Sequence, residues 1–134
     1  MNSSFLKNFI EYLEAKDASF VVGTNLFGGQ IPIEEANEKS SAVILRGGTP
    51  KRSILDGTVG NMRIQIYTRG VDYFDGQDRA ILIGNYLDDT AGVSITPYYI
   101  HTIMANSEPG YLGQDERGRY EFSQNFDIFY SDPS

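Results

Sequence analysis

Residues Tyr120 to Tyr130 read YEFSQNFDIFY, in which large apolar side chains alternate with polar ones. Successive side chains of a β-strand point to opposite faces of a sheet, so this period of two predicts a strand with one buried face. The buried face is expected to carry Tyr120, Phe122, Phe126, Ile128 and Tyr130, opposite Glu121, Ser123, Asn125 and Asp127. The sharpest alternation in the chain therefore predicts a core strand that begins directly after the charged turn DERGR.

A second alternating segment, Met62 to Arg69, reads MRIQIYTR. The period of two places its apolar side chains on one face: Met62, Ile64 and Ile66. The other face carries Arg63, Gln65, Tyr67 and Arg69 and is left to water or to a partner. We therefore expect a half-buried strand with arginines on its outer side.

Two further segments have the composition of strands. Tyr98 to Ala105, YYIHTIMA, is rich in aromatic and β-branched residues and precedes the turn signal ANSEPG. Ala42 to Arg46, AVILR, is a short apolar run of the kind that central strands show. Phe20 to Val22 and Gln30 to Ile33 are weaker candidates for one additional strand.

The first helix is expected from about Ser4 to Lys16. It follows serines that can cap a helix and repeats apolar residues at the three-and-four spacing of one helix face, namely Leu6, Phe9, Ile10 and Leu13. A second helix begins near Asp72 or Asp75, where an acidic side chain suits the positive N-terminal end of the helix dipole. We expect it to fray at Asp88-Asp89 and to stop at Ala91-Gly92.

The expected order of helix, strand, strand, helix, strand, strand predicts an α+β fold. We expect a single mixed or antiparallel sheet of about four strands, with both helices packed on one face. Residues 1–134 form one domain in this prediction, because the chain has the length of a single domain and contains no repeat or linker. Two long loops, at about 23–41 and 47–61, exceed the usual connections and are expected to be functional or mobile.

Composition argues against several classes of function. A formal net charge of -7, with only 11 lysines and arginines, disfavours free nucleic acid as a main partner. The absence of cysteine excludes disulfides, thiolate zinc sites and thiol nucleophiles. The N-terminal segment interrupts its apolar residues with Lys7, Asn8 and Glu11, so we expect neither a signal peptide nor a membrane span there.

Candidate catalytic residues are few. His101 is the only histidine, and its neighbours in sequence are not acidic, which favours a position on the polar side of its strand. Asp115 and Glu116 are adjacent carboxylates, but neighbouring side chains of an extended segment point apart and do not share a proton or an ion. A charged turn with Gly118 at a positive φ accounts for all of DERGR. We therefore expect no catalytic residue, metal site or cofactor, and keep a small binding module or hydrolase as an alternative.

The segment RGGTPKR, Arg46 to Arg52, gathers basic residues in an acidic protein. It lacks the spacing of a phosphate-binding P-loop, and no helix pattern follows that would offer its N-terminus to an anion. Two interpretations remain for this segment. It is either a solvated loop or an interaction loop in which Lys51 and Arg52 meet acidic groups on a neighbouring subunit.

Taken together, these motifs resemble the tail terminator, or tail completion, proteins of long flexible-tailed bacteriophages and prophages, which are often labelled minor capsid proteins. The resemblance covers about Ala42 to Tyr130 and is most specific in IQIYTRGVDYFDG and LGQDERGRYEFSQNFDIF. Besides Tyr73 at the start of the helix, the matching positions are Gly113, Asp115, Gly118, Arg119, Phe122, Asn125 and Phe126.

The resemblance implies a small structural subunit of the virion, without catalysis, that assembles as a ring on the end of the tail tube. The ring, a hexamer in the virion, stops polymerisation and joins the tail to the head. The implied partners are other copies of the chain, the major tail-tube protein and the head-completion or connector protein. DNA only passes through the lumen, where acidic walls repel it, and no membrane is involved. Assembly takes place in the cytoplasm of the bacterial host.

Ring contacts join one patch of a subunit to a different patch on the next, and complementary charge fixes their register. The candidate contact residues are charged side chains from the loops, the polar strand face and the turn: Lys51, Arg52, Arg63, Arg69, Asp115 and Glu116. A head-completion or connector protein on the capsid side is the alternative role within the same particle. Gene order distinguishes the two roles, since a terminator gene is expected directly before the gene for the major tail-tube protein.

Overall fold

The computed structural model describes residues 3–32, 39–46, 52–54 and 57–132. Helices and strands follow one another in the order α1 (Ser3–Glu14), β1 (Leu26–Gly28), β2 (Lys39–Arg46), β3 (Arg52–Ile54), β4 (Gly57–Gly70), α2 (Tyr73–Leu87), β5 (Thr90–Ile95), β6 (Tyr98–Ala105), β7 (Gly110–Gln114) and β8 (Tyr120–Ser131). The expected α+β class is confirmed, and both predicted helices are present.

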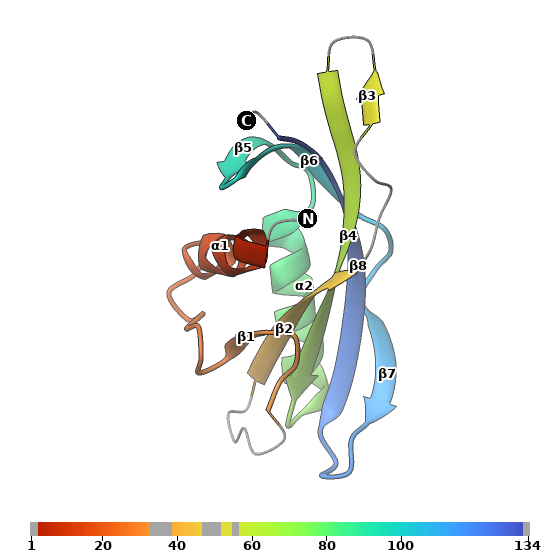
Figure 1. Cartoon of the computed structure of the whole chain (residues 1–134). Coiled ribbons are helices and arrows are strands. Elements are labelled where there is room, and N and C mark those ends of the chain that lie inside the picture. Colours follow the sequence, from red (N-terminus) through yellow and green to blue (C-terminus); the bar gives the residue numbers. More distant parts are fainter. Residues whose placement is uncertain (1–2, 33–38, 47–51, 55–56, 133–134) are drawn as a thin grey trace.

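The described strands form one curled sheet (Figure 1). Its continuous path is β1-β2-β4-β8-β6-β5, with β3 added beside β4 and β7 added beside β8. Only the β1–β2 pair is parallel among the described strands, so the sheet is mixed, as expected. The expected number of about four strands is wrong. The four strands that alternation or apolar runs predicted are β2, β4, β6 and β8, and four shorter strands pair with them.

The centre of the sheet is the antiparallel pair β4 and β8, in register from Val59 opposite Ser131 to Gly70 opposite Tyr120. The predicted alternation is confirmed on both strands, except that Tyr120, which was expected on the buried face, is only partly buried. The buried apolar side chains of this pair are Met62, Ile64 and Ile66 on β4 and Phe122, Phe126, Ile128 and Tyr130 on β8. A single cluster of buried apolar side chains contains most of these residues together with those of the helices, which locates the core on one face of the sheet.

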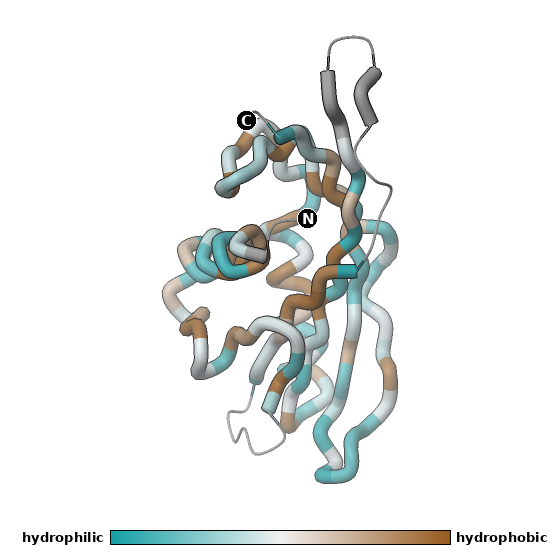
Figure 2. Tube along the Cα trace, viewed as in Figure 1, coloured by the Kyte–Doolittle hydropathy of each residue, from teal (hydrophilic) through white to brown (hydrophobic). Residues whose placement is uncertain are grey.

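Both helices lie on the concave side of the sheet, as expected (Figure 1). α1 ends two residues earlier than its predicted end at Lys16, and it buries one face against β1, β2 and β5. Of the residues that the three-and-four spacing identified, Phe9, Ile10 and Leu13 are buried and Leu6 is only partly buried. Phe5, which the spacing did not include, is buried as well. The brown segments of Figure 2 gather where the helices face the sheet, which is the pattern of an amphipathic layer.

α2 begins where the sequence predicted. The side chain of Asp72 caps it by accepting hydrogen bonds from the N–H groups of Phe74 and Asp75. The predicted end at Ala91-Gly92 is wrong, because the helix stops at Leu87 and those residues belong to β5. The reversal takes place at Asp89, which adopts a positive φ of 63° and donates its N–H to Ile103 O on β6. The pairing of β5 with β6 therefore ends the helix before Gly92, the residue that the sequence indicated as its stop.

The two long loops expected at 23–41 and 47–61 are shorter in the structure. The first contains β1 and the start of β2, and neither Phe20 to Val22 nor Gln30 to Pro32 is a strand, while Ile33 lies outside the described residues. In the second, β3 and the first residues of β4 form a hairpin with Ile54 opposite Gly57. The Asp-Gly step at Asp56 and Gly57 is a hairpin signal that the sequence interpretation passed over.

One edge of β8 is shared by two strands. β6 pairs with residues 126–131 of β8, and β7 pairs with residues 120–123. Residues 106–109 leave the sheet between them, although Asn106 N still donates to Asn125 O at 2.8 Å. α2 approaches β8 closely through Gly76 and Gly84, where an added Cβ would come within 2.9 Å of the Phe122 ring and 2.7 Å of Gln124 Oε1. This close approach places the helix end opposite the interruption of the sheet.

Candidate functional site

Asp115 holds the DERGR turn together. Its Oδ2 accepts a hydrogen bond from Arg119 Nε at 2.7 Å, and its Oδ1 accepts from the backbone N–H groups of Arg117 and Arg119 at 2.9 and 2.8 Å. Burial acts to raise the pKa of Asp115, but the hydrogen bonds from Arg119 and Arg117 outweigh it and lower the pKa below its ordinary value. Gly118 has a φ of 77°, so the predicted charged turn is confirmed.

The other sequence candidates for chemistry lie apart from this carboxylate. Glu116 is exposed on the turn that precedes β8. His101 is also exposed, and its Nε2 lies 3.1 Å from the hydroxyl of Ser131, the last residue of β8. Asp115 and His101 are therefore at opposite ends of β8, and the structure does not bring them together in one site.

The outer face of the sheet carries a row of polar contacts. Arg63 Nε lies 3.1 Å from Oδ1 of Asp127, its register partner on β8. The other oxygen of Asp127 accepts a hydrogen bond from Asn106 Nδ2 at 3.1 Å, and Arg46 Nε donates to Gln65 Oε1 at 2.8 Å. The Arg63 side chain is 49% exposed. Arg63 is thus a candidate contact residue that faces solvent on the convex side of the molecule.

Arg69 shares the outer face of β4 but is buried. Its guanidinium donates to the carbonyl oxygen of Pro32 at 3.0 Å, so it binds the segment after β1 onto the sheet. A pocket of about 190 Å³ in the same place is also lined by Glu121, the register partner of Arg69. The hydrogen bond of Arg69 to Pro32 is thus a contact within the chain and not with a partner.

The remaining two candidates are Lys51 and Arg52, which are adjacent in the sequence. Lys51 is outside the described residues. Arg52 is the first residue of β3, and its backbone pairs with Val59 of β4. Figure 1 shows that β3 and the start of β4 extend beyond the rest of the sheet. The backbone therefore places Arg52 on a projecting hairpin.

A buried arginine that the sequence interpretation did not single out joins α2 to two other elements. Arg79 Nε donates to Ser41 Oγ and its NH2 group donates to Asn25 O, both at 2.8 Å. The guanidinium carbon lies 4.8 Å from the centroid of the Phe20 ring. Burial lowers the pKa of Arg79 to about 10, although the charge of Asp17 acts to raise it. The signal was present in the helical spacing, since Arg79 precedes Ile83 by four residues on the buried stripe.

Asp17 extends this network to the surface. Its carboxylate accepts hydrogen bonds from Ser19 N and Ser19 Oγ at 2.8 and 2.7 Å and from the Tyr86 hydroxyl at 2.8 Å. These bonds from Ser19 and Tyr86 lower the pKa of Asp17, and the bond to Asp17 raises the pKa of Tyr86. The arrangement ties the loop after α1 to α2 and has the character of a structural support.

An aromatic cluster surrounds the start of α2. Tyr73 is its centre, with the rings of Phe74, Tyr111, Tyr120 and Phe122 at centroid distances between 5.2 and 5.8 Å. Phe122 is buried, whereas Phe74 is 68% exposed and Tyr111 is 48% exposed. Exposed aromatic rings of this kind are enriched where proteins bind one another. The cluster thus presents an apolar surface beside β7.

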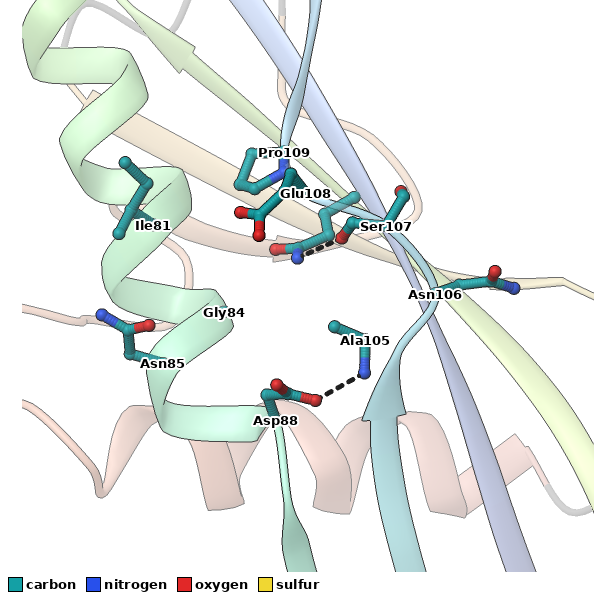
Figure 3. A pocket seen from close by; sticks show the side chains of 10 residues that line it. Ile81, Gly84, Asn85, Asp88, Ala105, Asn106, Ser107, Glu108 and Pro109 are labelled. Atoms are coloured by element: carbon teal, nitrogen blue, oxygen red, sulfur yellow. Dashed lines mark hydrogen bonds between the residues drawn. The ribbon is translucent and has the colours of Figure 1, made fainter.

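A polar pocket of about 410 Å³ lies between α2 and the segment that joins β6 to β7 (Figure 3). Its lining comes from α2, from the end of β6, from residues 106–109 and from β8: Ile81, Gly84, Asn85, Asp88, Ala105, Asn106, Ser107, Glu108, Pro109 and Gln124. The carboxylate of Asp88 accepts a hydrogen bond from Ala105 N at 2.7 Å, which fastens the helix end to β6. The pocket therefore exists because β6 and β7 leave a gap along β8 that α2 faces.

Gln124 forms the base of this pocket and is only 7% exposed. Its Nε2 donates to Ser107 O at 2.6 Å, whereas its Oε1 has no hydrogen-bond partner among the described residues. A buried acceptor without a donor costs about 1–3 kcal/mol, so native proteins seldom retain one without a reason. The sequence carries a signal for it, since Gln124 occupies the inward register between Phe122 and Phe126.

The described residues contain no group of three or more His, Cys, Asp or Glu side chains arranged to hold a metal ion. Within the same residues, neither helix combines the length and the apolar character that a membrane crossing requires. What the surface offers instead is a set of contact features: the polar outer face, the aromatic cluster and the polar pocket.

Comparison with known families matches residues 12–131 to the model of the bacteriophage tail terminator protein. The chain belongs to the bacteriophage tail terminator family. The match confirms the resemblance that the sequence motifs indicated, and it includes the DERGR turn, the aromatic cluster and the polar pocket. As a member of a structural tail terminator family, the chain is a phage structural protein.

The fold of this tail terminator family member also occurs in a solved particle. A chain in the virion of a native gene transfer agent (GTA) particle superimposes with a TM-score of 0.61 at 11% sequence identity. The alignment covers 89% of this chain and 84% of that chain, and at this identity it establishes likeness of fold. Comparison with proteins of curated function finds no match.

Proposed function

We propose that this chain caps the tail tube as a ring subunit, terminates tail polymerisation and forms the head-to-tail joining interface. The observation that carries the proposal is the match of residues 12–131 to the tail terminator family. The occurrence of a similar fold in the virion of a gene transfer agent particle adds support. In this proposal the ring is a hexamer located at the head-tail junction of the virion, after assembly in the host cytoplasm.

The candidate contacts of this ring are distributed over different parts of the subunit. Arg63 lies on the polar outer face, Asp115 and Glu116 lie on the turn before β8, and Arg52 begins β3. Lys51, which precedes Arg52 in the sequence, is also a proposed contact residue. Arg69 contributes by holding the segment before β2 against the sheet. Patches that differ in charge and lie apart suit heterologous contacts, in which each subunit meets the next through a different surface.

The tail tube and the head connector are the proposed partners beyond the ring itself. The exposed rings of the aromatic cluster supply the apolar part of such a contact. A net charge of -7 supports a lumen through which DNA passes without adhering, because like charges repel. The proposed role uses no cofactor, catalytic residue or membrane.

The proposal is tested with tail tubes assembled from the major tail-tube protein. After addition of the purified chain, electron microscopy is expected to show a ring on one end of each tube, and tube length is expected to stop increasing. Mass photometry of the released caps then gives the number of subunits. A chain that stays monomeric and leaves both tube ends free and growing contradicts the proposal.

A head-completion or connector protein remains the rival role within the same particle. The family match favours the terminator, because the model that matches residues 12–131 is that of the bacteriophage tail terminator protein. Incubation with tail-less heads separates the two roles. A terminator is expected to bind tubes in the absence of heads, whereas a head-completion protein binds heads in the absence of tubes.

A further inference from the structure

We propose that the polar pocket between α2 and residues 106–109 receives a lysine or arginine side chain from a second copy of this chain, an inference that rests on the proposed ring. The pocket would then be the acceptor half of a heterologous contact, with the cation supplied by the neighbouring subunit. Three features of the pocket lead to this occupant: its charge, its unpaired buried acceptor and its shape.

The residues that line the pocket carry negative charge and no positive charge. Asp88 and Glu108 are both exposed, and no lysine or arginine is among the residues that line the pocket. Asp88 is also the C-cap of α2, so the pocket faces the helix end that carries partial negative charge. Figure 3 shows Asp88 on the helix side and Glu108 on the opposite segment. Both carboxylates and the helix end favour a cation between them.

The unpaired acceptor is Oε1 of Gln124. The amide nitrogen must face Ser107, because a carbonyl oxygen at 2.6 Å can only accept a hydrogen bond. This orientation directs Oε1 toward Gly84 at the wall of the pocket, where no described group donates to it. Gln124 is more than nine-tenths buried, and a donor that enters the pocket beside Gly84 would supply the hydrogen bond that Oε1 lacks. Ammonium and guanidinium groups carry donors alone and match this need.

The shape suits a side chain with a long apolar stem. A volume of about 410 Å³ would hold on the order of a dozen waters at ~30 Å³ each, which is ample for one lysine or arginine. Ile81 and Pro109 provide apolar walls for the methylene groups, and the polar groups lie deeper or at the rim. An acidic or phosphate-bearing occupant is disfavoured, because it would meet Asp88 and Glu108.

A second copy is the occupant that the charge distribution favours. The described surface of the chain has exposed basic residues outside the pocket, namely Lys7, Lys16, Lys39, Arg46, Arg63 and Arg117. In a ring of identical subunits, one of these basic side chains would enter the acidic pocket of the next copy, and each copy would use both surfaces once.

The chemistry of the pocket is tested on the intact protein by NMR titration with L-arginine amide. L-citrulline amide is the matched control, because it has nearly the same shape but no charge. Arginine amide is expected to shift the side-chain amide of Gln124 and the backbone amides of Ala105 and Ser107 saturably, with affinity at least threefold higher than for citrulline amide. The variant Glu108→Gln is expected to abolish this preference. Equal shifts with the two probes, or shifts outside the pocket, overturn the proposal.

The identity of the occupant is tested in assembly on tail tubes. Glu108→Lys places a cation at the pocket mouth and is expected to reduce ring formation by about tenfold or more. Asp78→Lys makes the same charge change at an exposed position on α2 outside the lining, and is expected to assemble like the wild type. Equal assembly of the Glu108→Lys variant and the wild type overturns the second copy as occupant. If the wild type itself forms no ring, the proposed function fails, and the arginine titration separately decides whether the pocket binds a cation.

Discussion

Arg79 Nε donates a hydrogen bond to Ser41 Oγ at 2.8 Å and thereby joins α2 to β2 across 38 positions of sequence. Ser41 Oγ also lies 3.1 Å from Thr68 Oγ1 on β4. The other end of the guanidinium donates to Asn25 O in the loop before β1. One buried side chain therefore holds a helix, a strand and a loop in a fixed arrangement behind the outer face of the sheet.

Replacement Arg79→Met is expected to lower the free energy of unfolding by about 2–4 kcal/mol, because Asn25 O loses its charged donor and the buried network is broken. Urea unfolding followed by circular dichroism measures the change. Arg63→Met is the control at an exposed position and is expected to change stability by less than about 1 kcal/mol. Equal losses of unfolding free energy in the two variants would show that the buried contacts of Arg79 do not stabilise the fold more than an exposed ion pair does.

Gly70→Ala is expected to destabilise the fold by about 1–3 kcal/mol through overpacking. A Cβ at Gly70 would come within 2.6 Å of the backbone nitrogen of Gly76, where β4 passes the first turn of α2. Gly110→Ala, on β7, would place its Cβ no closer than 3.9 Å to Ser123 O and should be close to neutral. Thermal unfolding of both variants checks the contrast, and a neutral Gly70→Ala would contradict the close approach of helix and strand.

Asp115→Asn is expected to reduce stability near neutral pH by about 1 kcal/mol, because the charged acceptor of the turn is lost. The pKa of Asp115 is lowered in the folded state, so between the folded and unfolded pKa values the unfolded chain binds more protons and wild-type stability rises with pH. The difference in unfolding free energy between wild type and variant thus has its largest value above the ordinary aspartate pKa of about 3.9. It disappears as the pH falls through the lowered pKa of the folded state.

Unfolding free energies measured from pH 2 to 7 test this dependence. Glu116→Gln, an exposed neighbour on the same turn, is expected to leave the difference from wild type flat across that range. An Asp115→Asn variant whose deficit persists unchanged at pH 2 would rule out the carboxylate as its cause.

The long elements of this fold were predictable because each carries its own periodic signal. β8 and β4 alternate over enough residues to define a buried face, and α1 repeats its apolar residues at helical spacing. β1, β3, β5 and β7 have no such signal, since they are short or lie at an edge, and pairing with a longer strand stabilises them. β5 illustrates the point, because of its six residues only Ile95 is buried.

The candidate pocket was not predictable from local pattern. Its walls come from α2 and from residues 106–109, and these segments meet only because β6 and β7 share one edge of β8 with a gap between them. Strand pairing over long sequence distance determines that gap, and no local spacing encodes it. The sequence did hold one clue, a glutamine at the inward register of an otherwise aromatic and aliphatic strand face.

Phe74→Ser is expected to weaken binding to tail-tube ends by about tenfold while changing unfolding free energy by no more than about 0.5 kcal/mol. Phe74 is 68% exposed, so its ring contributes little to the core but offers the largest apolar surface of the aromatic cluster. Val21→Ser, at a residue that is 44% exposed near α1, is the control and should bind as the wild type does. Cosedimentation with tubes measures both variants, and unchanged binding by Phe74→Ser would remove the cluster from the interface.

Gln124→Met is expected to separate stability from assembly. The substitution removes the unpaired Oε1 together with the hydrogen bond to Ser107, and methionine fills a similar volume, so unfolding free energy should stay level or rise by about 1 kcal/mol. Ring formation and arginine-amide binding should nevertheless fall by about tenfold, because the donor of the incoming cation loses its buried acceptor. Gln77→Met, on α2 outside the pocket, should change neither quantity. A buried polar group that serves binding destabilises the isolated subunit until a partner forms the missing hydrogen bond. A variant that loses stability but still assembles would therefore show that Gln124 serves the fold alone.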